Sequence, residues 1–202
     1  SDNFDLNADN VKIYFDKSLY DITELNADGN VKFNSLNFKM KGSGKFLKFE
    51  VKVERLKVEG SNSELISDDI KMFSDGSIEV NNLDGNFSLK GKNSKLINES
   101  VLIKADSIEG IFSESTGKKE IEFLNVIDNN IAYVKNNDTE MYAKKINFDN
   151  NTSIIELIDS VTIIRNEEKI TGDYGTLDTI NNSYKIKSKN QTKVTVIIQN
   201  NE

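Results

Sequence analysis

An enzyme with this composition would have to use carboxylates, Lys or Tyr, and the sequence shows no convergent set of them. The chain has 33 Asp and Glu residues but no His and no Cys. It therefore lacks the commonest general base and the thiol nucleophile. Neighbouring carboxylates occur at Asp68-Asp69 and Glu167-Glu168. Neighbours on a strand point to opposite faces of the sheet, so neither pair suits acid and base catalysis on one substrate. We expect no catalytic residue and no enzyme activity.

Two Asp-Gly segments superficially resemble the beginning of a calcium loop: NADGN at 26–30 and SDGS at 74–77. The bidentate Glu that closes an EF-hand loop is missing from both. Without Cys or His, the usual zinc ligands are absent as well. The sequence therefore predicts ordinary turns at these segments, with no metal and no cofactor.

The overall charge argues against nucleic acid as a partner. Lys and Arg number 26 against 33 Asp and Glu, which gives a net charge of −7, and such a chain repels phosphate backbones. No apolar run approaches the roughly 20 residues of a membrane-spanning helix. The first residues, SDNFDLNADN, do not form a signal peptide. We expect that a leader or membrane anchor is not present in this chain.

Strands are the elements that must position the remaining side chains. Apolar and polar residues alternate along most of the chain, for example at 49–53 and 194–198, and this alternation gives a strand one apolar and one polar face. Gly- and Asn-rich segments between the apolar stretches, for example 26–30, 41–45 and 128–130, predict tight turns. The sequence therefore predicts an all-β fold of short antiparallel strands.

The apolar positions change parity in two places, near Asn34-Ser35 and between Val53 and Leu56. A parity change requires a bulge or a turn, and strands that keep changing parity bend into a folded-over sheet. The best helical candidate is SNSELISDDIKMF at 61–73, although its apolar residues form no long stripe. No linker and no shift in composition divides the chain, so we expect residues 1–202 to form a single domain.

A turn followed by an apolar, polar, apolar triplet recurs along the chain. It occurs in LNADGNVKFN at 25–34, NNLDGNFSLKG at 81–91 and ELIDSVTIIRN at 156–166. A second recurring piece is a small residue followed by Asp, as in Ala105-Asp106 and Gly172-Asp173. The triplets are unevenly spaced, so the repeat is not a solenoid of fixed period.

From residue 141 onwards the order of these pieces becomes specific. MYAKKINFDNNTSIIELIDSVTIIRNEEKITGDYGTLDTINNSYKIKSKNQTKVTVII runs through a small residue, a strand, an Asn turn, two apolar strands and the piece ITGDYGTLD. This order resembles the OstA-like family of lipopolysaccharide transport proteins, and the resemblance is strongest over 103–198. The sequence departs from the family at Asp159-Ser160, where the family usually carries Gly-Asn or Gly-Asp. The residues that match the family unit are Ile155, Leu157, Val161, Ile163, Ile170, Gly172 and Asp173.

The resemblance implies an antiparallel β-jellyroll, in which two sheets fold over each other around an open apolar interior. It further implies a non-enzymatic periplasmic carrier that holds the acyl chains of lipid A and passes lipopolysaccharide from the inner to the outer membrane. Buried apolar area contributes about 25 cal/mol per Å², so such an interior needs no site-specific chemistry. The implied partners are lipopolysaccharide and other jellyroll proteins of the transport bridge. They pair end to end through strand edges, and a head-to-tail homo-oligomer is one form of this pairing.

The interior of such a jellyroll would be lined by apolar side chains from many strands. The same side chains would be plain core in any β-sandwich. Two other functions stay open: the periplasmic part of a membrane-anchored LptC-like protein, and a structural or adhesive β-repeat protein that binds no lipid, for which a fully filled interior is expected. The residues expected to line the interior and contact lipid are Phe33, Phe38, Val51, Val53, Phe87, Leu89, Phe123, Phe148, Leu157, Val161 and Ile163.

Overall fold

The protein consists almost entirely of β-strands, as the sequence predicts. The computed structural model describes residues 4–18, 21–68, 70–99, 101–115, 118–166, 168–181, 183–188 and 193–198. Within these ranges the only helical element is a short 3-10 helix, η1 Val51–Val53, and no helix there has the length and apolarity to cross a membrane. The strands are β1 Phe4–Asn7, β2 Asn10–Phe15, β3 Ile22–Ser35, β4 Met40–Glu50, β5 Arg55–Glu59, β6 Ser63–Ser67, β7 Ile70–Ser74, β8 Ser77–Asn81, β9 Asn86–Asn98, β10 Val101–Ser115, β11 Lys118–Asn136, β12 Thr139–Asp149, β13 Ile154–Arg165, β14 Glu168–Asp178, β15 Ser183–Lys187 and β16 Thr195–Ile198.

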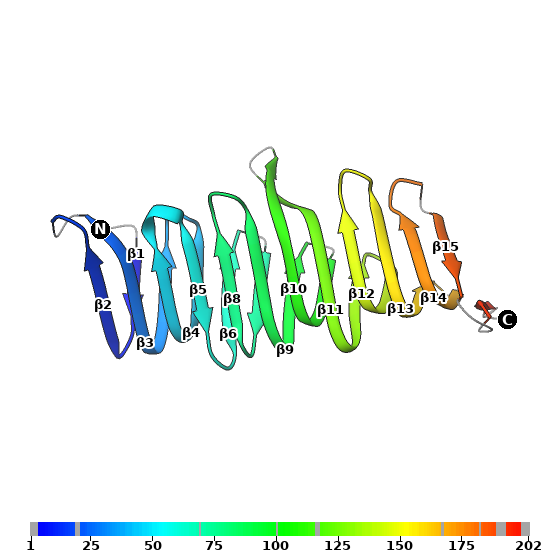
Figure 1. Cartoon of the computed structure of the whole chain (residues 1–202), viewed down its shortest axis with the longest axis horizontal. Helices are drawn as coiled ribbons and strands as arrows, with labels where there is room; N and C mark the ends of the chain where they lie inside the picture. The colour runs from blue at the N-terminus through cyan, green and yellow to red at the C-terminus, as the bar shows by residue number, and fades with distance from the viewer. Residues whose placement is uncertain are drawn as a thin grey trace.

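The strands form one continuous antiparallel sheet in nearly sequential order. Its main path runs β1-β3-β4-β5-β8-β9-β10-β11-β12-β13-β14-β15, while β2, β6, β7 and β16 pair beside it. Figure 1 shows the strands side by side in chain order along the long axis, with the two termini at opposite ends. Short hairpins suffice for most of these connections because most strands pair with the next strand in the chain.

The long strands bend in the middle. The pairing register shifts between Asp28 and Val31 in β3, between Ile127 and Ala132 in β11, and between residues 158 and 161 in β13. Such shifts are β-bulges, which bend a strand. Because the bulges are aligned from strand to strand, the sheet folds along one line, which we call the corner and which runs along the lower side of Figure 1.

The corner divides the sheet into two layers. The strand ends that lie farthest from the corner form an open edge. Consecutive segments within each layer are paired with one another. Layer A comprises β2, 22–28, 46–50, β5, β8, 86–90, 107–111, 122–127, 145–149, 154–158, 174–178 and β15, and layer B comprises β1, 31–35, 40–44, β6, β7, 94–98, 101–105, 132–136, 139–143, 161–165, 168–172 and β16.

Side chains of two kinds form the corner. On the outside, Asp and Asn side chains satisfy the backbone of the bulges: the Asp106 N–H donates to Asp128 Oδ2 at 3.0 Å, and the Asn129 N–H donates to Asp106 Oδ2 at 3.1 Å. On the inside, small residues let the layers approach each other. Six of these small residues are at most 4% exposed: Ser63, Ser74, Ser94, Ala105, Ala132 and Ala143. The recurring small residue and Asp in the sequence therefore belong to the corner.

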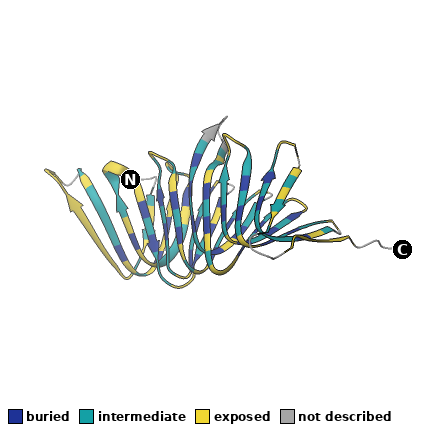
Figure 2. Cartoon of the chain, turned by 45° about the vertical axis from the view of Figure 1, so that its right-hand side comes forward, coloured by how far each residue is buried: buried dark blue, intermediate teal, exposed yellow. Residues whose placement is uncertain are grey.

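The apolar faces of the two layers pack against each other. Buried side chains alternate with partly or fully exposed ones along the strands (Figure 2), for example in β6, where Ser63, Leu65 and Ser67 are buried. The all-β, folded-over arrangement is thus confirmed. The two parity changes named from the sequence, however, lie at the turns that follow β3 and β4, and the bulges that fold the sheet lie elsewhere. The residues that are completely enclosed include Leu65 from layer B and Ile78 and Leu89 from layer A.

Several local predictions were wrong. The helical candidate at 61–73 is the hairpin of β6 and β7, because its apolar residues alternate with period two. The segments 26–30, 41–45 and 128–130 lie within β3, β4 and β11 and do not connect separate strands. Gly and Asn supply the same backbone freedom to a bulge as to a turn, so composition alone does not distinguish the two.

Candidate functional site

Six of the eleven residues expected in the interior lie there, fully enclosed. Phe33, Phe87, Leu89, Leu157, Val161 and Ile163 are each at most 5% exposed. Phe38 and Phe148 are partly buried and pack against the same core. Contact of any of these side chains with lipid stays a prediction.

The expected interior position is wrong for Val51, Val53 and Phe123. Strand β4 ends at Glu50, and Val51 and Val53 lie in the 3-10 helix that follows, where Val53 is 40% exposed. Phe123 is 41% exposed on the outer face of layer A, because Leu124 beside it points inward. At both places a bulge or turn changes the parity of the strand, which the alternation pattern alone does not reveal.

Aromatic side chains fill the interior near the N-terminus. The ring of Phe4 lies 6.1 Å from that of Phe33 and 6.2 Å from that of Phe49, and Phe38 meets Phe49 edge-on at 5.5 Å. The cavity that remains among these rings measures about 10 Å³. A single water molecule needs at least roughly that volume, so this part of the interior has no room for a ligand while the rings keep these positions.

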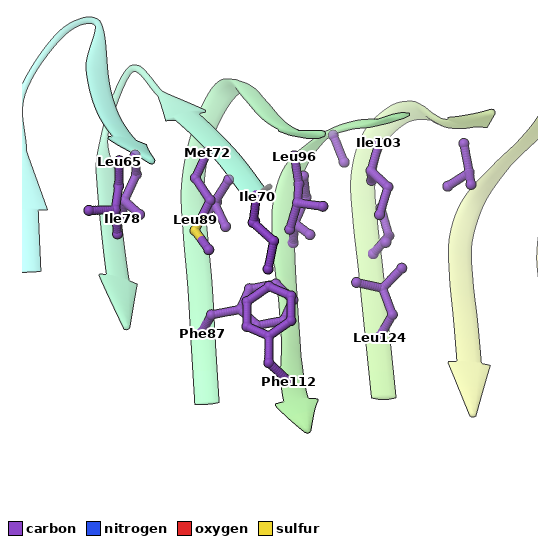
Figure 3. Close-up of a cluster of buried hydrophobic side chains, with 14 of the residues drawn as sticks. Leu65, Ile70, Met72, Ile78, Phe87, Leu89, Leu96, Ile103, Phe112 and Leu124 are labelled. Atoms are coloured by element: carbon purple, nitrogen blue, oxygen red, sulfur yellow. The ribbon is translucent and has the colours of Figure 1, made fainter. Parts of the chain in front are cut away.

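A second aromatic contact fills the middle of the interior. Phe87 of β9 and Phe112 of β10 stack with ring centroids 4.1 Å apart and an interplanar angle of 20° (Figure 3). Gly110 makes this possible, because a Cβ at that position would lie 2.6 Å from Phe87 Cζ. Ile70 of layer B points toward the ring pair from the opposite side.

An open apolar pocket begins beyond this stack. We call it the C-terminal pocket; it lies between the layers at the open edge and has a volume of about 250 Å³. Polar groups occur at its rim, among them Asn98, Asn136 and Thr179. Its apolar lining consists of Val101, Ile121, Leu124, Val134, Ile146, Phe148 and Ile155.

Of the residues named from the sequence as interior, only Phe148 lines this pocket. Leu124, for example, was missed because its neighbour Phe123 was assigned to the inner face instead. The alternation of Leu124 and Val126 in β11 could have indicated the pocket lining, because these two residues share one face of the strand and both are buried. That alternation places Leu124 and not Phe123 on the inner face.

A larger groove of about 760 Å³ lies on the outer face of layer A, and both polar residues such as Asn147 and apolar residues such as Phe123 and Phe148 line it. At its centre Tyr174 donates a hydrogen bond of 2.7 Å to Glu156 Oε1, and Asn147 donates one of 3.0 Å to Glu156 Oε2. These hydrogen bonds lower the pKa of Glu156 below its usual value. A carboxylate held ionised in this way is a poor general acid.

Of the carboxylates considered for catalysis, the structure describes Asp68 and Glu168. Asp68 has a positive φ of 48° in the turn between β6 and β7, and Glu168 accepts a hydrogen bond of 2.8 Å from Tyr184. Asp69 and Glu167 lie outside the described residues. Among the residues that the structure does describe, no group of three or more Asp or Glu side chains is placed to hold a metal ion.

Comparison with known proteins points to one family. A family model described as "LptA/(LptD N-terminal domain) LPS transport protein" matches residues 74–183, more than half of the chain. Among solved structures, LptH, the LptA-homologous periplasmic component of the lipopolysaccharide transport device of Pseudomonas aeruginosa, is similar with a TM-score of 0.53 and 14% sequence identity. The match covers 65% of this chain and 95% of LptH. No curated protein matches the sequence.

Proposed function

Because the chain belongs to the LptA/LptD N-terminal domain family of lipopolysaccharide transport proteins, we propose that it is a non-enzymatic carrier that holds the acyl chains of lipid A in its interior. The observation that carries this proposal is the C-terminal pocket, which is apolar, lies between the two layers and reaches the open edge. An apolar cavity of about 150 Å³ accommodates benzene, so a cavity of 250 Å³ accommodates roughly ten carbons of an acyl chain.

The mainly apolar lining of the pocket suits a lipid better than a polar substrate. Acyl chains would lie among the apolar side chains, while the polar lining residues Asn98, Glu120, Asn136 and Thr179 would lie toward the sugars. An interior filled along its whole length is what a purely structural β-protein would have. Here buried side chains such as Leu157 and Ile163 fill the C-terminal half as well, but the pocket at the open edge remains unfilled. The open pocket therefore favours the carrier over the structural protein.

We further propose that the protein acts in the periplasm, passes lipid from the inner to the outer membrane and pairs end to end with other jellyroll proteins of the bridge. The description of LptH as a periplasmic component supports the location. The exposed apolar side chains of the terminal strands support the pairing: Ile13 of β2 is 43% exposed, and Val196 and Ile198 of β16 are 55% and 63% exposed. The continuous sheet supports a single jellyroll domain over residues 1–202.

A single fluorescent label tests the carrier function. The chain has no Cys, so Phe148→Cys provides one site in the C-terminal pocket for a polarity-sensitive dye. Purified lipopolysaccharide should shift the emission of this dye to the blue, and delipidated polysaccharide should not. The matched control is Phe123→Cys on the adjacent strand, which faces outward. The proposal fails if the pocket label does not respond, or if both labels respond equally.

A further inference from the structure

The hairpin of β10 and β11 extends beyond the open edge of layer A. Strand β9 pairs with β10 only as far as Asn86 and Ile111. Past this point β10 pairs with β11 alone, after a register shift that leaves Glu122 without a paired residue. Figure 1 shows this hairpin rising above its neighbours. We call its described inner part, residues 111–113 and 119–121, the strap.

The strap contacts both layers. The Phe112 N–H donates a hydrogen bond of 2.9 Å to the Gly85 carbonyl oxygen, and the Phe112 ring, which is 8% exposed, stacks on Phe87 of layer A. Lys119 Nζ donates a hydrogen bond of 3.1 Å to Ser67 Oγ, at the end of β6 in layer B. Ser67 is 3% exposed and is paired with Ile70, the residue that points toward the two rings. The strap thus joins the two layers across the open edge.

The interior differs on the two sides of the strap. Toward the N-terminus the remaining cavity among Phe4, Phe33, Phe38 and Phe49 is about 10 Å³. Toward the C-terminus the pocket measures about 250 Å³, and Ile121 of the strap forms part of its wall. Ring centroids 4.1 Å apart are in van der Waals contact, and Ile70 of layer B points toward the same rings (Figure 3), so the stack narrows the space between the layers at this point.

We propose that the strap is a barrier that confines acyl chains to the C-terminal pocket, and that passage toward the N-terminal half requires Phe112 to leave Phe87 and Lys119 to release Ser67. This inference rests on the proposed carrier function. It assigns Phe112 and Lys119 as the residues that decide how far along the interior a lipid extends. The strap can move with less disturbance than the layers, because residues 112 and 113 have strand pairing with β11 alone, although the backbone hydrogen bond from Phe112 to Gly85 ties them to layer A.

Photocrosslinking at two positions of the full chain tests the barrier. A photoreactive residue replaces Phe148 in the C-terminal pocket or Phe38 among the N-terminal aromatic rings, and purified lipopolysaccharide is the probe. We expect at least about ten times more crosslinked lipid at position 148 than at position 38. Equal crosslinking at the two positions would overturn the barrier while the carrier function stands. Crosslinking at neither would instead contradict the carrier function.

Two variants then test the residues of the strap. Phe112→Ala should raise crosslinking at position 38 several-fold, whereas the matched control Phe123→Ala, on the outer face of the same hairpin, should not. Lys119→Ala removes the contact with Ser67 without opening the core, and it should raise crosslinking at position 38 even if Phe112→Ala fails to fold. If crosslinking at position 38 does not rise in Lys119→Ala, or rises equally in Phe123→Ala, the assignment of Phe112 and Lys119 as the barrier residues is contradicted.

Discussion

The corner can be tested by exchanging the sequences of two bulges. In β3 the bulge contains Gly29 and Asn30, with φ of 79° and 51°. In β13 it contains Asp159 and Ser160, with φ of 62° and 57°. Both bulges therefore contain two consecutive residues in the left-handed conformation. Of the two, only the bulge in β3 carries the Gly-Asn sequence that is usual in the OstA-like family. We predict that the double variant Asp159→Gly/Ser160→Asn is more stable than the natural chain.

The expected gain follows from backbone energetics. A non-glycine residue in the left-handed region costs about 1–2 kcal/mol, least for Asn and Asp, and both Asp159 and Ser160 are exposed, so few contacts offset the strain. Glycine removes the strain but costs about 0.5–1 kcal/mol more conformational entropy on folding. The net gain is about 1 kcal/mol, which raises the Tm of a chain of this size by about 2–4 °C.

The reverse exchange, Gly29→Asp/Asn30→Ser, should cost more than the forward exchange gains. A Cβ at Gly29 would collide with the side chain of Asp9, and the hydrogen bond of 2.9 Å from Asn30 Nδ2 to Asp9 Oδ2 would be lost. The combined cost is about 2–3 kcal/mol. Urea unfolding followed by circular dichroism measures both free energies. The reasoning is refuted if the forward variant is destabilised, or if the reverse variant is as stable as the natural chain.

Three further predictions concern the core, the pH dependence and the terminal strand. Leu157→Ala, at a fully buried position, should lower the free energy of unfolding by about 2–5 kcal/mol, whereas Val53→Ala should change it by less than about 0.5 kcal/mol; similar values in urea unfolding would contradict the assigned burial. Burial and a hydrogen bond to a carboxylate raise the pKa of Tyr142 from 10.0 to about 12. Because the unfolded chain then loses this proton first, stability should fall as the pH rises from 10 to about 12, and Tyr142→Phe should reduce this loss in unfolding experiments across that range. Val196→Lys/Ile198→Lys should lower end-to-end association in sedimentation velocity, and unchanged association would exclude β16 from the contact.

The sequence predicted the fold class correctly because period-two alternation is a local signal. Leu89, Val161 and Ile163 alternate with polar neighbours and are buried as expected. The recurring Ala105-Asp106 piece also had a structural cause, since it marks the corner. What the local pattern did not reveal was whether a Gly- and Asn-rich segment such as 26–30 connects two strands or bends one.

The candidate pocket was largely missed for a physical reason. Whether an inward side chain belongs to a filled or an open part of the interior depends on what lies opposite it in the other layer. Phe87 is closed off by Phe112, which stands 25 positions later, whereas Phe148 borders a cavity. Such contacts between layers are set by the bulges and by the β10–β11 hairpin, and no local sequence pattern records them.

The most direct test of the central claim is photocrosslinking in living cells from position 148, with position 123 as the control on the outer face. We predict that lipopolysaccharide, identified by mass spectrometry of the crosslinked product, attaches at position 148 and not at position 123. Attachment at neither position, or to the same extent at both, would contradict a carrier that holds lipid between its two layers.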